Sequence, residues 1–280
     1  MKLANAGGRA AIIVDGKLVD IAAASDGRFG PDLRSVYDRW EEFTVAAPGF
    51  TGPTSALDEP TLGPPSPEPR QVFAIGLNYR AHAEEAKMDV PSIPATFTKF
   101  PSCITGPFAD VTLPGKTVDW EVELVAVIGR TARNVPVERG WQYIAGLTVG
   151  QDISERTVQM AAGRQFSLGK SFTGFGPTGP WLVTPDEFDN PDDLELGCSL
   201  DGEVLQNSRT SDLIFPVARL VAELSAVVTL YPGDLIFTGT PSGVGMARKP
   251  PRFLTAGSTL ETWIEGIGRM RNRITAGAHS

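Results

Sequence analysis

The sequence predicts a β-rich α+β fold with a few flanking helices and a small N-terminal module. Short apolar runs of strand length outnumber the segments with helical periodicity. Two pairs of these runs are joined by Asp-Gly, at residues 15–16 and 201–202, a turn signal typical of β-hairpins. These observations favour a mostly antiparallel sheet over a doubly wound parallel one.

The composition is that of a globular protein, with 280 residues, 41% hydrophobic and 21% charged. The formal net charge of -8 disfavours nucleic acid as a partner, because no basic stripe is available to neutralise phosphates. No apolar run approaches the ~18 residues of a transmembrane helix. The first apolar run is broken at Asp15, which argues against a signal peptide. We therefore expect no membrane association and a cytoplasmic location.

The cysteines and histidines restrict the kinds of metal site. Cys103 and Cys198 are far apart without zinc-type spacing, so we expect two buried thiols. Of the two histidines, His279 lies in the polar C-terminal tail, and imidazole chemistry therefore depends on His82. A zinc site built from several histidines is excluded by count.

The first 66 residues are expected to form the small module and a proline-rich linker, and residues 67–280 the main domain. Arg9 to Ala24 resembles a hairpin, and a short helix is expected from about Leu33 to Phe43. Seven of the 23 prolines lie between Ala47 and Arg70, which indicates an extended crossing between the two parts.

The main domain begins with a strand ending at Ile75, followed by a helix with His82 and Glu85. Residues three apart share one helical face, so Glu85 can fix the orientation and tautomer of the imidazole. The alternative is a surface helix with scattered charges.

Asp119 to Arg130 is predicted to be a buried strand that contains Glu121 and Glu123. Because strand side chains alternate, both carboxylates point to one face, about 6.5 to 7 Å apart. Valines continue this face at positions 125 and 127, so the acids are not expected to be simply solvent-exposed. The alternative is a strand end with two solvated acids.

A third carboxylate, Asp152, follows another apolar run and precedes a helix predicted from Ile153 to Ala162. Three carboxylates that converge from two strand ends suit a hard divalent cation such as Mg²⁺, Mn²⁺ or Ca²⁺.

The remaining segments continue the β-rich pattern. Short strands are expected around residues 96–100, 103–106 and 111–114, a second hairpin at 196–206, an amphipathic helix with Pro216 in its first turn, and paired strands at 259–274. Lys170 lies between glycine-rich turns, where a lysine is usually solvated. The loop after residue 237 lacks both glycine patterns of nucleotide sites, and its backbone amides at Gly239 and Thr240 are candidates to bind a substrate carboxylate.

Six motifs resemble, in order, those of the fumarylacetoacetate hydrolase family: GLNYRAHAEEA, DWEVELVAVIGR, QDISERTVQ, GKSFTGFGPTGPWLV, GDLIFTGTPSGVG and IEGIGRMRN. The resemblance covers Gln71 to Ile274. The segments FGPTGPWLVT, DISER and KPPRFL are most similar to the bacterial branch that hydrolyses 2,4-diketo-3-deoxy sugar acids, a type of acylpyruvate. The resemblance implies a mixed β roll with flanking helices and a homodimer whose interface is made by the main domain.

The resemblance also implies that Glu121, Glu123 and Asp152 bind Mg²⁺ or Mn²⁺, with Ca²⁺ as an occupant in crystals. It implies catalytic roles for His82 and Glu85 as an acid-base pair and for Lys170 at a substrate oxygen. The residues expected to bind substrate are Tyr79, Arg156, Gly239 and Thr240.

Three positions depart from the family pattern. Ile75 stands where the long animal enzyme has a fourth carboxylate, which leaves one coordination position to water. Gln151 replaces a histidine that often precedes the metal aspartate, and Phe166 replaces a tryptophan. We expect the last two to line or approach the pocket and to affect the choice of substrate.

The expected activity is metal-dependent hydrolysis of a carbon-carbon bond in a ketonic substrate, a 2,4-diketo acid, to pyruvate and a carboxylic acid. His82 would activate the attacking water, and Lys170 would stabilise charge on oxygen. Oxaloacetate decarboxylation and keto-enol tautomerisation remain alternatives, because each also passes through a metal-bound enolate. A non-catalytic binding protein or partner subunit on the same fold is a further alternative.

Overall fold

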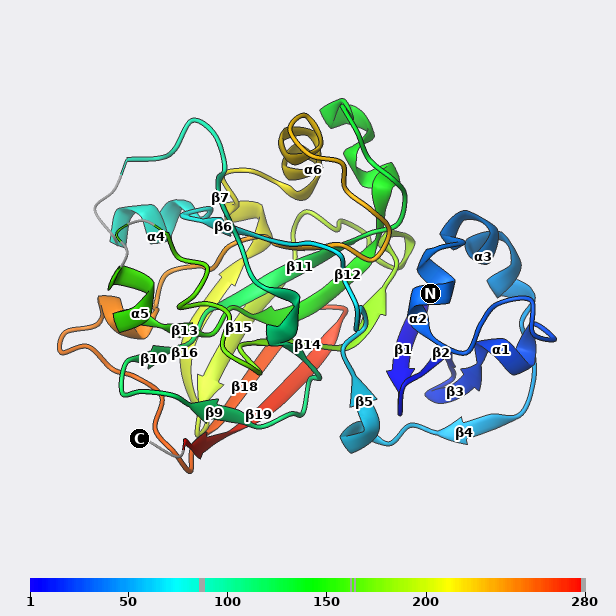
Figure 1. Ribbon diagram of the computed structural model, residues 1–280, viewed down its shortest axis with the longest axis horizontal. Coiled ribbons are helices and arrows are strands. Elements are labelled where there is room, and N and C mark those ends of the chain that lie inside the picture. The colour runs from blue at the N-terminus through cyan, green and yellow to red at the C-terminus, as the bar shows by residue number, and fades with distance from the viewer. Residues whose placement is uncertain (86–88, 162, 164, 278–280) are drawn as a thin grey trace.

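The computed structural model describes residues 1–85, 89–161, 163 and 165–277. Two sheets form the body of the molecule, with short helices at their edges, and the N-terminal segment lies at one end (Figure 1). The predicted β-rich α+β fold is confirmed. His279 and Ala162, the last residue of one predicted helix, lie outside the described residues.

The larger sheet has the strand order β4-β3-β2-β1-β14-β12-β11-β17-β6-β7, with β5 paired to β1 and β8 paired to β14. Most neighbours are antiparallel, as expected, but β17 and β6 are parallel, as are β14 and β8. The strands are β1 Lys2–Ala6, β2 Arg9–Val14, β3 Lys17–Asp20, β4 Thr54–Ala56, β5 Leu62–Gly63, β6 Val72–Gly76, β7 Ala95–Thr98, β8 Ile104–Thr105, β11 Val122–Ile128, β12 Ile144–Gln151, β14 Gly176–Val183 and β17 Leu235–Phe237.

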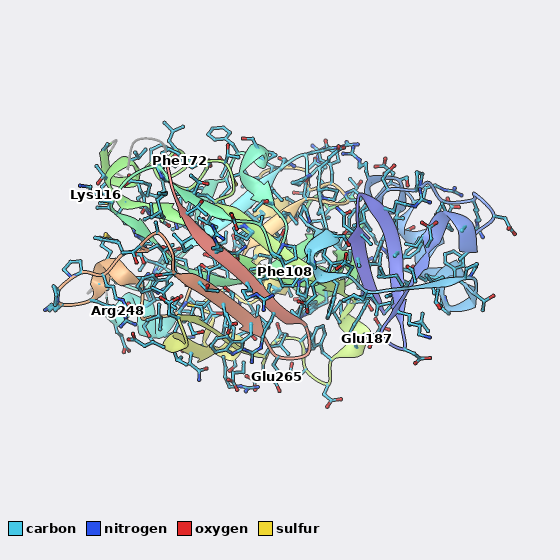
Figure 2. The ribbon with its side chains drawn as sticks, turned by 90° about the horizontal axis from the view of Figure 1, so that it is seen from below. Phe108, Lys116, Phe172, Glu187, Arg248 and Glu265 are labelled. Atoms are coloured by element: carbon cyan, nitrogen blue, oxygen red, sulfur yellow. The ribbon has the colours of Figure 1, made fainter. Side chains whose placement is uncertain are left out.

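The smaller sheet has the order β16-β15-β18-β19-β9, and β10 pairs with β13 beside it. Figure 2, the view from below, shows β18 and β19 in orange and red running across the face opposite the helix α6, which lies at the top of Figure 1. The strands are β9 Val111–Leu113, β10 Val118–Asp119, β13 Ser154–Glu155, β15 Glu195–Leu200, β16 Glu203–Arg209, β18 Thr259–Ile264 and β19 Gly268–Ala276. The α-helices are α1 Ile21–Ala24, α2 Leu33–Tyr37, α3 Trp40–Ala46, α4 Arg80–Glu85, α5 Arg156–Ala161 and α6 Val217–Ser225.

Strand β11 separates two hydrophobic cores, and its side chains alternate between them. Val122 and Leu124 belong to the core shared with the smaller sheet. Val125 and Val127 belong to the core shared with the N-terminal helices. The predicted alternation along this strand is therefore confirmed, and it fixes the face on which Glu123 lies.

The N-terminal segment extends the larger sheet, because Leu3 of β1 pairs with Leu182 of β14. The predicted hairpin forms as β2 and β3. The single predicted helix is divided into α2 and α3, with Asp32 accepting a hydrogen bond from Ser35 N at the start of α2. The boundary at residue 66 stays a prediction.

Two helix starts differ from prediction. Asp152 is followed by the short strand β13, and α5 begins at Arg156 instead of Ile153. Pro216 is the N-cap of α6 and lies just before its first turn. In both cases the residues before the helix are in extended conformation. Their backbone groups form hydrogen bonds outside the helix, as when Ile153 N donates to Phe175 O.

The turn between β6 and α4 positions the first candidate catalytic residues. Leu77 adopts a positive φ of 52° at this turn. The buried Asn78 amide then donates to Phe215 O and Thr238 O and accepts from Phe215 N. These bonds fix the entry to α4 against the end of β17.

Candidate active site

Three buried carboxylates meet at adjacent ends of β11 and β12. Glu121, Glu123 and Asp152 each offer an oxygen, and these oxygens lie within 4.8 Å of one another. The strand pairing explains this, because Glu123 is opposite Gly150 and Asp152 N donates to Glu121 O. The three residues predicted from the sequence are thus brought together.

Lys170 bridges two of these carboxylates and is buried, contrary to the ordinary expectation for a loop lysine. Its Nζ lies 2.7 Å from Glu121 Oε2 and 2.6 Å from Asp152 Oδ2. Burial opposes the charge, but the nearby carboxylates outweigh it and raise the pKa of Lys170. Lys170 is therefore a cation at neutral pH and suits stabilisation of anionic oxygen better than proton abstraction.

A second buried lysine, Lys99, was not identified from the sequence. Its Nζ lies 2.6 Å from Asp152 Oδ1 and 3.2 Å from Phe175 O, and it also donates to Lys170 O. Lys99 follows the exposed strand β7, and nothing in that pattern distinguishes it from a surface lysine. Its role becomes visible only once the distant loop 170–175 is folded over it.

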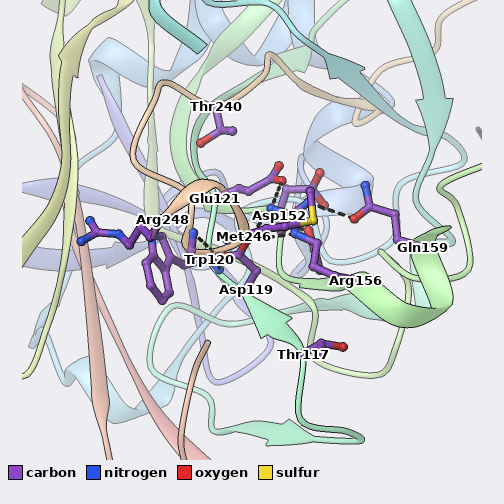
Figure 3. A network of polar contacts seen from close by, with 12 residues as sticks. Thr117, Asp119, Trp120, Glu121, Asp152, Arg156, Gln159, Thr240, Met246 and Arg248 are labelled. Atoms are coloured by element: carbon purple, nitrogen blue, oxygen red, sulfur yellow. Dashed lines mark hydrogen bonds and ion pairs between the residues drawn. The ribbon is translucent and has the colours of Figure 1, made fainter. Parts of the chain in front are cut away.

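Arg156 lies against Glu121 and Asp119, as Figure 3 shows. Its guanidinium donates to Asp119 Oδ2 through Nε at 2.9 Å and Nη2 at 2.7 Å, and Nη2 is 2.8 Å from Glu121 Oε1. Its Nη1 donates to Gln159 Oε1. In this structure Arg156 bonds protein groups and supports a metal-ligand candidate, and its role in substrate binding stays a prediction. Asp119, predicted from the sequence only as the start of a strand, is its main partner.

The neighbouring cations act unequally on the pKa values of the carboxylates. Burial raises the pKa of Glu121, but the charges of Lys170 and Arg156 outweigh burial and lower this pKa to about 2. Burial and the neighbouring Asp152 and Glu121 raise the pKa of Glu123 well above its ordinary value. Among the described residues, no lysine, arginine or histidine forms an ion pair with Glu123. Glu123 is the carboxylate that most needs an added positive charge.

Gly239 and Tyr79 lie beside Glu123. The Gly239 amide, expected to receive a substrate carboxylate, donates to Glu123 Oε2 over 2.7 Å in this structure. Tyr79 is fully buried, and its hydroxyl has no hydrogen-bond partner within the described part of the chain. Burial, with the charge of Glu123, raises the pKa of Tyr79, so the phenol is a neutral hydroxyl near the site.

His82 and Glu85 form the predicted pair on α4. His82 Nδ1 lies 3.1 Å from Glu85 Oε2, and the exposed fractions of the two side chains are 16% and 26%. The pair is connected to the carboxylates through the loop after β17, since Gly243 N donates to Glu85 and Gly239 N donates to Glu123. Glu85 is partly buried, and although burial opposes its ionisation, bonds from His82 and Gly243 N lower its pKa. The pair thus combines an oriented imidazole with an ionised carboxylate.

Three further predictions concern the rim. Thr240 Oγ1 accepts from Gln206 Nε2, and its contact with substrate stays a prediction. Gln151 was expected to approach the pocket, but its buried amide accepts from Glu121 N and donates to Thr262, so it supports Glu121 from the side of the smaller sheet. Phe166 is half-buried against Phe97, whose ring lies 5.4 Å from Lys170 Nζ.

The donor set fits a hard divalent cation. Carboxylate oxygens are the preferred ligands of Mg²⁺ and Mn²⁺, and a buried group of three must be neutralised. Lys170, Lys99 and Arg156 account for Glu121 and Asp152 but leave Glu123 unpaired. Glu121, Glu123 and Asp152 would hold the ion, and Ile75, fully apolar and buried, adds no fourth carboxylate.

The fold and the site define an enzyme of the fumarylacetoacetate hydrolase superfamily. The model of the fumarylacetoacetate hydrolase C-terminal domain matches residues 71–275, so the chain belongs to this family. The family predicted from the motifs is confirmed.

Relatives carry out several reactions. The oxaloacetate tautomerase Fahd2a, mitochondrial, of Rattus norvegicus is 44% identical over 212 residues, which cover 75% of this chain and 68% of the relative. A Mycobacterium smegmatis protein provisionally named HpcE has a crystal structure with a TM-score of 0.95 and 52% identity, covering 99% of this chain and 100% of its own. Maleylpyruvate hydrolase from Sphingobium sp. SYK-6, crystallised with manganese(II) and pyruvate, has a TM-score of 0.79 and 30% identity, covering 99% and 100%.

These similarities make the chain an enzyme of a family that includes hydrolases, isomerases and a tautomerase, and they agree with a divalent metal at the acidic triad. Across the described residues, no helix combines the length and apolar character needed to span a bilayer.

Proposed function

We propose that the protein is a divalent-metal-dependent hydrolase that cleaves a carbon-carbon bond in an acylpyruvate-type 2,4-diketo acid and releases pyruvate and a carboxylic acid. The observation that carries this proposal is one loop, residues 239–243, that bonds both to Glu123 of the buried carboxylate group and to Glu85, the partner of His82. It is supported by the similarity to a maleylpyruvate hydrolase that was crystallised with manganese(II) and pyruvate.

Mg²⁺ or Mn²⁺ held by Glu121, Glu123 and Asp152 would supply Lewis-acid stabilisation of negative charge on the 2-keto oxygen. The protein contributes the anionic ligands, and these three residues are at most 6% exposed. Low exposure strengthens every charge interaction made there.

His82 provides the base in this proposal. Because Nδ1 faces Glu85, the other ring nitrogen, Nε2, is available to take a proton from water. The resulting hydroxide attacks the 4-keto carbon, the bond between carbons 3 and 4 breaks, and its electron pair moves into the pyruvate enolate. Glu85 stabilises the imidazolium, and protonation of carbon 3 completes pyruvate.

Lys170 stabilises the negative oxygen in this proposal. Its raised pKa keeps the ammonium charged, and its bonds to Glu121 and Asp152 hold the charge at the site before substrate arrives. A preorganised cation of this kind lowers the cost of developing an oxyanion.

Tautomerisation of oxaloacetate is the second candidate. It is favoured by the 44% identity to the rat oxaloacetate tautomerase, which is higher than the 30% identity to maleylpyruvate hydrolase. The same His82 could move a proton between carbon 3 and solvent without activating water for attack. The two functions therefore differ in what His82 deprotonates.

A substrate panel distinguishes the candidates. Protein stripped with EDTA and reloaded with Mn²⁺ or Mg²⁺ is assayed on acylpyruvates, 2,4-diketo-3-deoxy sugar acids and oxaloacetate, with pyruvate measured by a coupled dehydrogenase and enol loss by absorbance. Metal-dependent pyruvate release from a diketo acid supports the hydrolase. Faster ketonisation of oxaloacetate with no pyruvate release supports the tautomerase, and inactivity on the whole panel contradicts both.

A further inference from the structure

A buried aspartate, Asp119, connects a candidate metal ligand to the loop after β17. Its side chain is fully buried. Oδ1 accepts from Gly245 N at 2.7 Å, and Oδ2 accepts from Met246 N at 2.9 Å and from the Arg156 guanidinium. Oδ1 also accepts from the neighbouring Trp120 N at 2.8 Å. The other donors belong to segments more than thirty residues away, so Asp119 joins α5 and the loop to the end of β10.

Arg156 contacts both Asp119 and the candidate metal ligand Glu121. The same Nη2 atom lies 2.7 Å from Asp119 Oδ2 and 2.8 Å from Glu121 Oε1. In Figure 3 Arg156 reaches between the two acids, with Met246 beside them. An arginine held by one carboxylate has little freedom to turn, so the orientation of Glu121 depends on Asp119 although the two acids do not bond directly.

The loop is also tied to the other side chains of the site. Gly239 N donates to Glu123, and Gly243 N donates to Glu85 at 3.1 Å. The amides of Gly245 and Met246 donate to Asp119. Gly245 cannot be replaced by a larger residue, because an added Cβ would lie 2.7 Å from Asp119 Oδ1 and closer still to Arg252 O. The backbone of residues 239–246 therefore donates hydrogen bonds to three acids of this region, Glu123, Glu85 and Asp119.

We infer that Asp119 is a positioning residue that, through Arg156, orients Glu121 for the cation and at the same time holds the 243–246 loop against the site. This inference rests on the metal site of the proposed function. Through Asp119, metal binding and the ordering of the loop are coupled. Because such coupling is reciprocal, metal binding should order the loop, and an ordered loop should strengthen metal binding.

The test uses Asp119→Asn, which keeps the shape but removes the negative charge and replaces one of the two acceptor oxygens by an NH2 donor. Titration calorimetry with Mn²⁺ should show an affinity about 10- to 100-fold below wild type, the range expected when a partner of a metal ligand is lost. Hydrogen exchange at the Gly245 and Met246 amides should be faster in the variant, and added Mn²⁺ should slow it in wild type but much less in Asp119→Asn. Glu41→Gln, which removes one negative charge from an exposed pair with Arg130 far from this loop in sequence, is the control and should match wild type in both measurements.

A double-mutant cycle separates positioning from general destabilisation. Arg156→Lys keeps the positive charge but cannot bond both acids in the same way. This single variant should therefore already weaken Mn²⁺ binding. If Asp119 acts through Arg156, the double variant should bind Mn²⁺ no more weakly than the single variant with the lower affinity. If the two residues acted independently, their losses of binding free energy would add. Additive losses, or wild-type affinity in Asp119→Asn, overturn the inference. If Asp119→Asn does not fold, Arg156→Lys with unchanged Mn²⁺ affinity and unchanged loop exchange overturns it equally. Failure of wild-type protein to bind Mn²⁺ is a different result, which overturns the proposed function and this inference with it.

Discussion

Lys99 Nζ lies 2.6 Å from Asp152 Oδ1, and the exposed fractions of the two side chains are 0% and 1%. The same ammonium donates to the backbone oxygens of Lys170 and Phe175. One buried cation thus fixes both a candidate metal ligand and the loop that carries Lys170.

Replacing Lys99 by Met is expected to destabilise the fold by about 3–5 kcal/mol, because Asp152 is left as a buried charge with one fewer partner. Urea denaturation of the metal-free protein measures the loss. The matched control is Lys116→Met at an exposed lysine, labelled in Figure 2, with an expected change within about 0.5 kcal/mol. Equal stability of the two variants would show that the Lys99 pair contributes nothing.

Glu123→Gln is expected to remain folded and to bind Mn²⁺ more than about 100-fold more weakly than wild type, because it removes a ligand and not merely the partner of one. The raised pKa of Glu123 means that a neutral side chain is tolerated in the metal-free fold. Calorimetry and circular dichroism measure both properties. Wild-type affinity in this variant would refute the metal assignment.

The same raised pKa predicts how metal affinity depends on pH. Below the raised value Glu123 holds a proton that the cation must displace, so affinity should fall as pH falls through that pKa. Calorimetry in two buffers with different ionisation enthalpies should detect proton release on binding. Glu123→Gln should release fewer protons, and a pH-independent affinity would contradict the prediction.

Stability without metal should change in the opposite sense. An acid whose pKa is higher in the folded than in the unfolded state stabilises the fold at low pH, and this contribution is lost as pH rises from the ordinary glutamate value of about 4.3 through the raised one. The melting temperature of EDTA-treated protein should therefore fall across this range more steeply in wild type than in Glu123→Gln. Identical curves would show that the proton on Glu123 has no influence on folding.

His82→Ala separates hydrolysis from chemistry that needs no attacking water. Loss of a general base should lower the rate of acylpyruvate cleavage by about 10²- to 10⁴-fold. Mn²⁺ affinity should stay near wild type, since His82 is not among the three carboxylate ligands. Any oxaloacetate decarboxylation should decrease far less. If both activities decrease equally with metal still bound, protonation of the enolate is the better role for His82.

The parts of the candidate site that could be predicted are those set by the local periodicity of a strand or a helix. Glu121 and Glu123 share a face because strand side chains alternate, and His82 meets Glu85 because a helix brings positions three apart together. Both relations involve neighbours in sequence, so an ordinary periodicity argument finds them.

Long-range partners could not be found in this way. Lys99 and Asp152 are 53 residues apart, and Asp119 and Arg156 are 37 apart. Their pairing depends on how β12, α5 and the loop 170–175 pack, for which no local sequence signal exists. The parallel pairing of β17 with β6 was likewise missed, because strands 163 residues apart in register carry no mark of their direction. The bond from Gly239 N to Glu123 is another long-range contact without a local signal, and the contact of Gly239 with a substrate carboxylate stays a prediction.

The loop after β17 is attached to the active-site acids through its main chain, and this determines which changes it can accept over evolution. An N–H bond does not depend on the identity of the side chain, so Met246, which is 43% exposed, can vary without releasing Asp119, except to proline. Gly239 and Gly243 both have a φ of 102° and are not free to vary. A saturation library of this loop should therefore accept many residues at 246 and few at 239 and 243, with Mn²⁺ affinity unchanged in the accepted variants at 246.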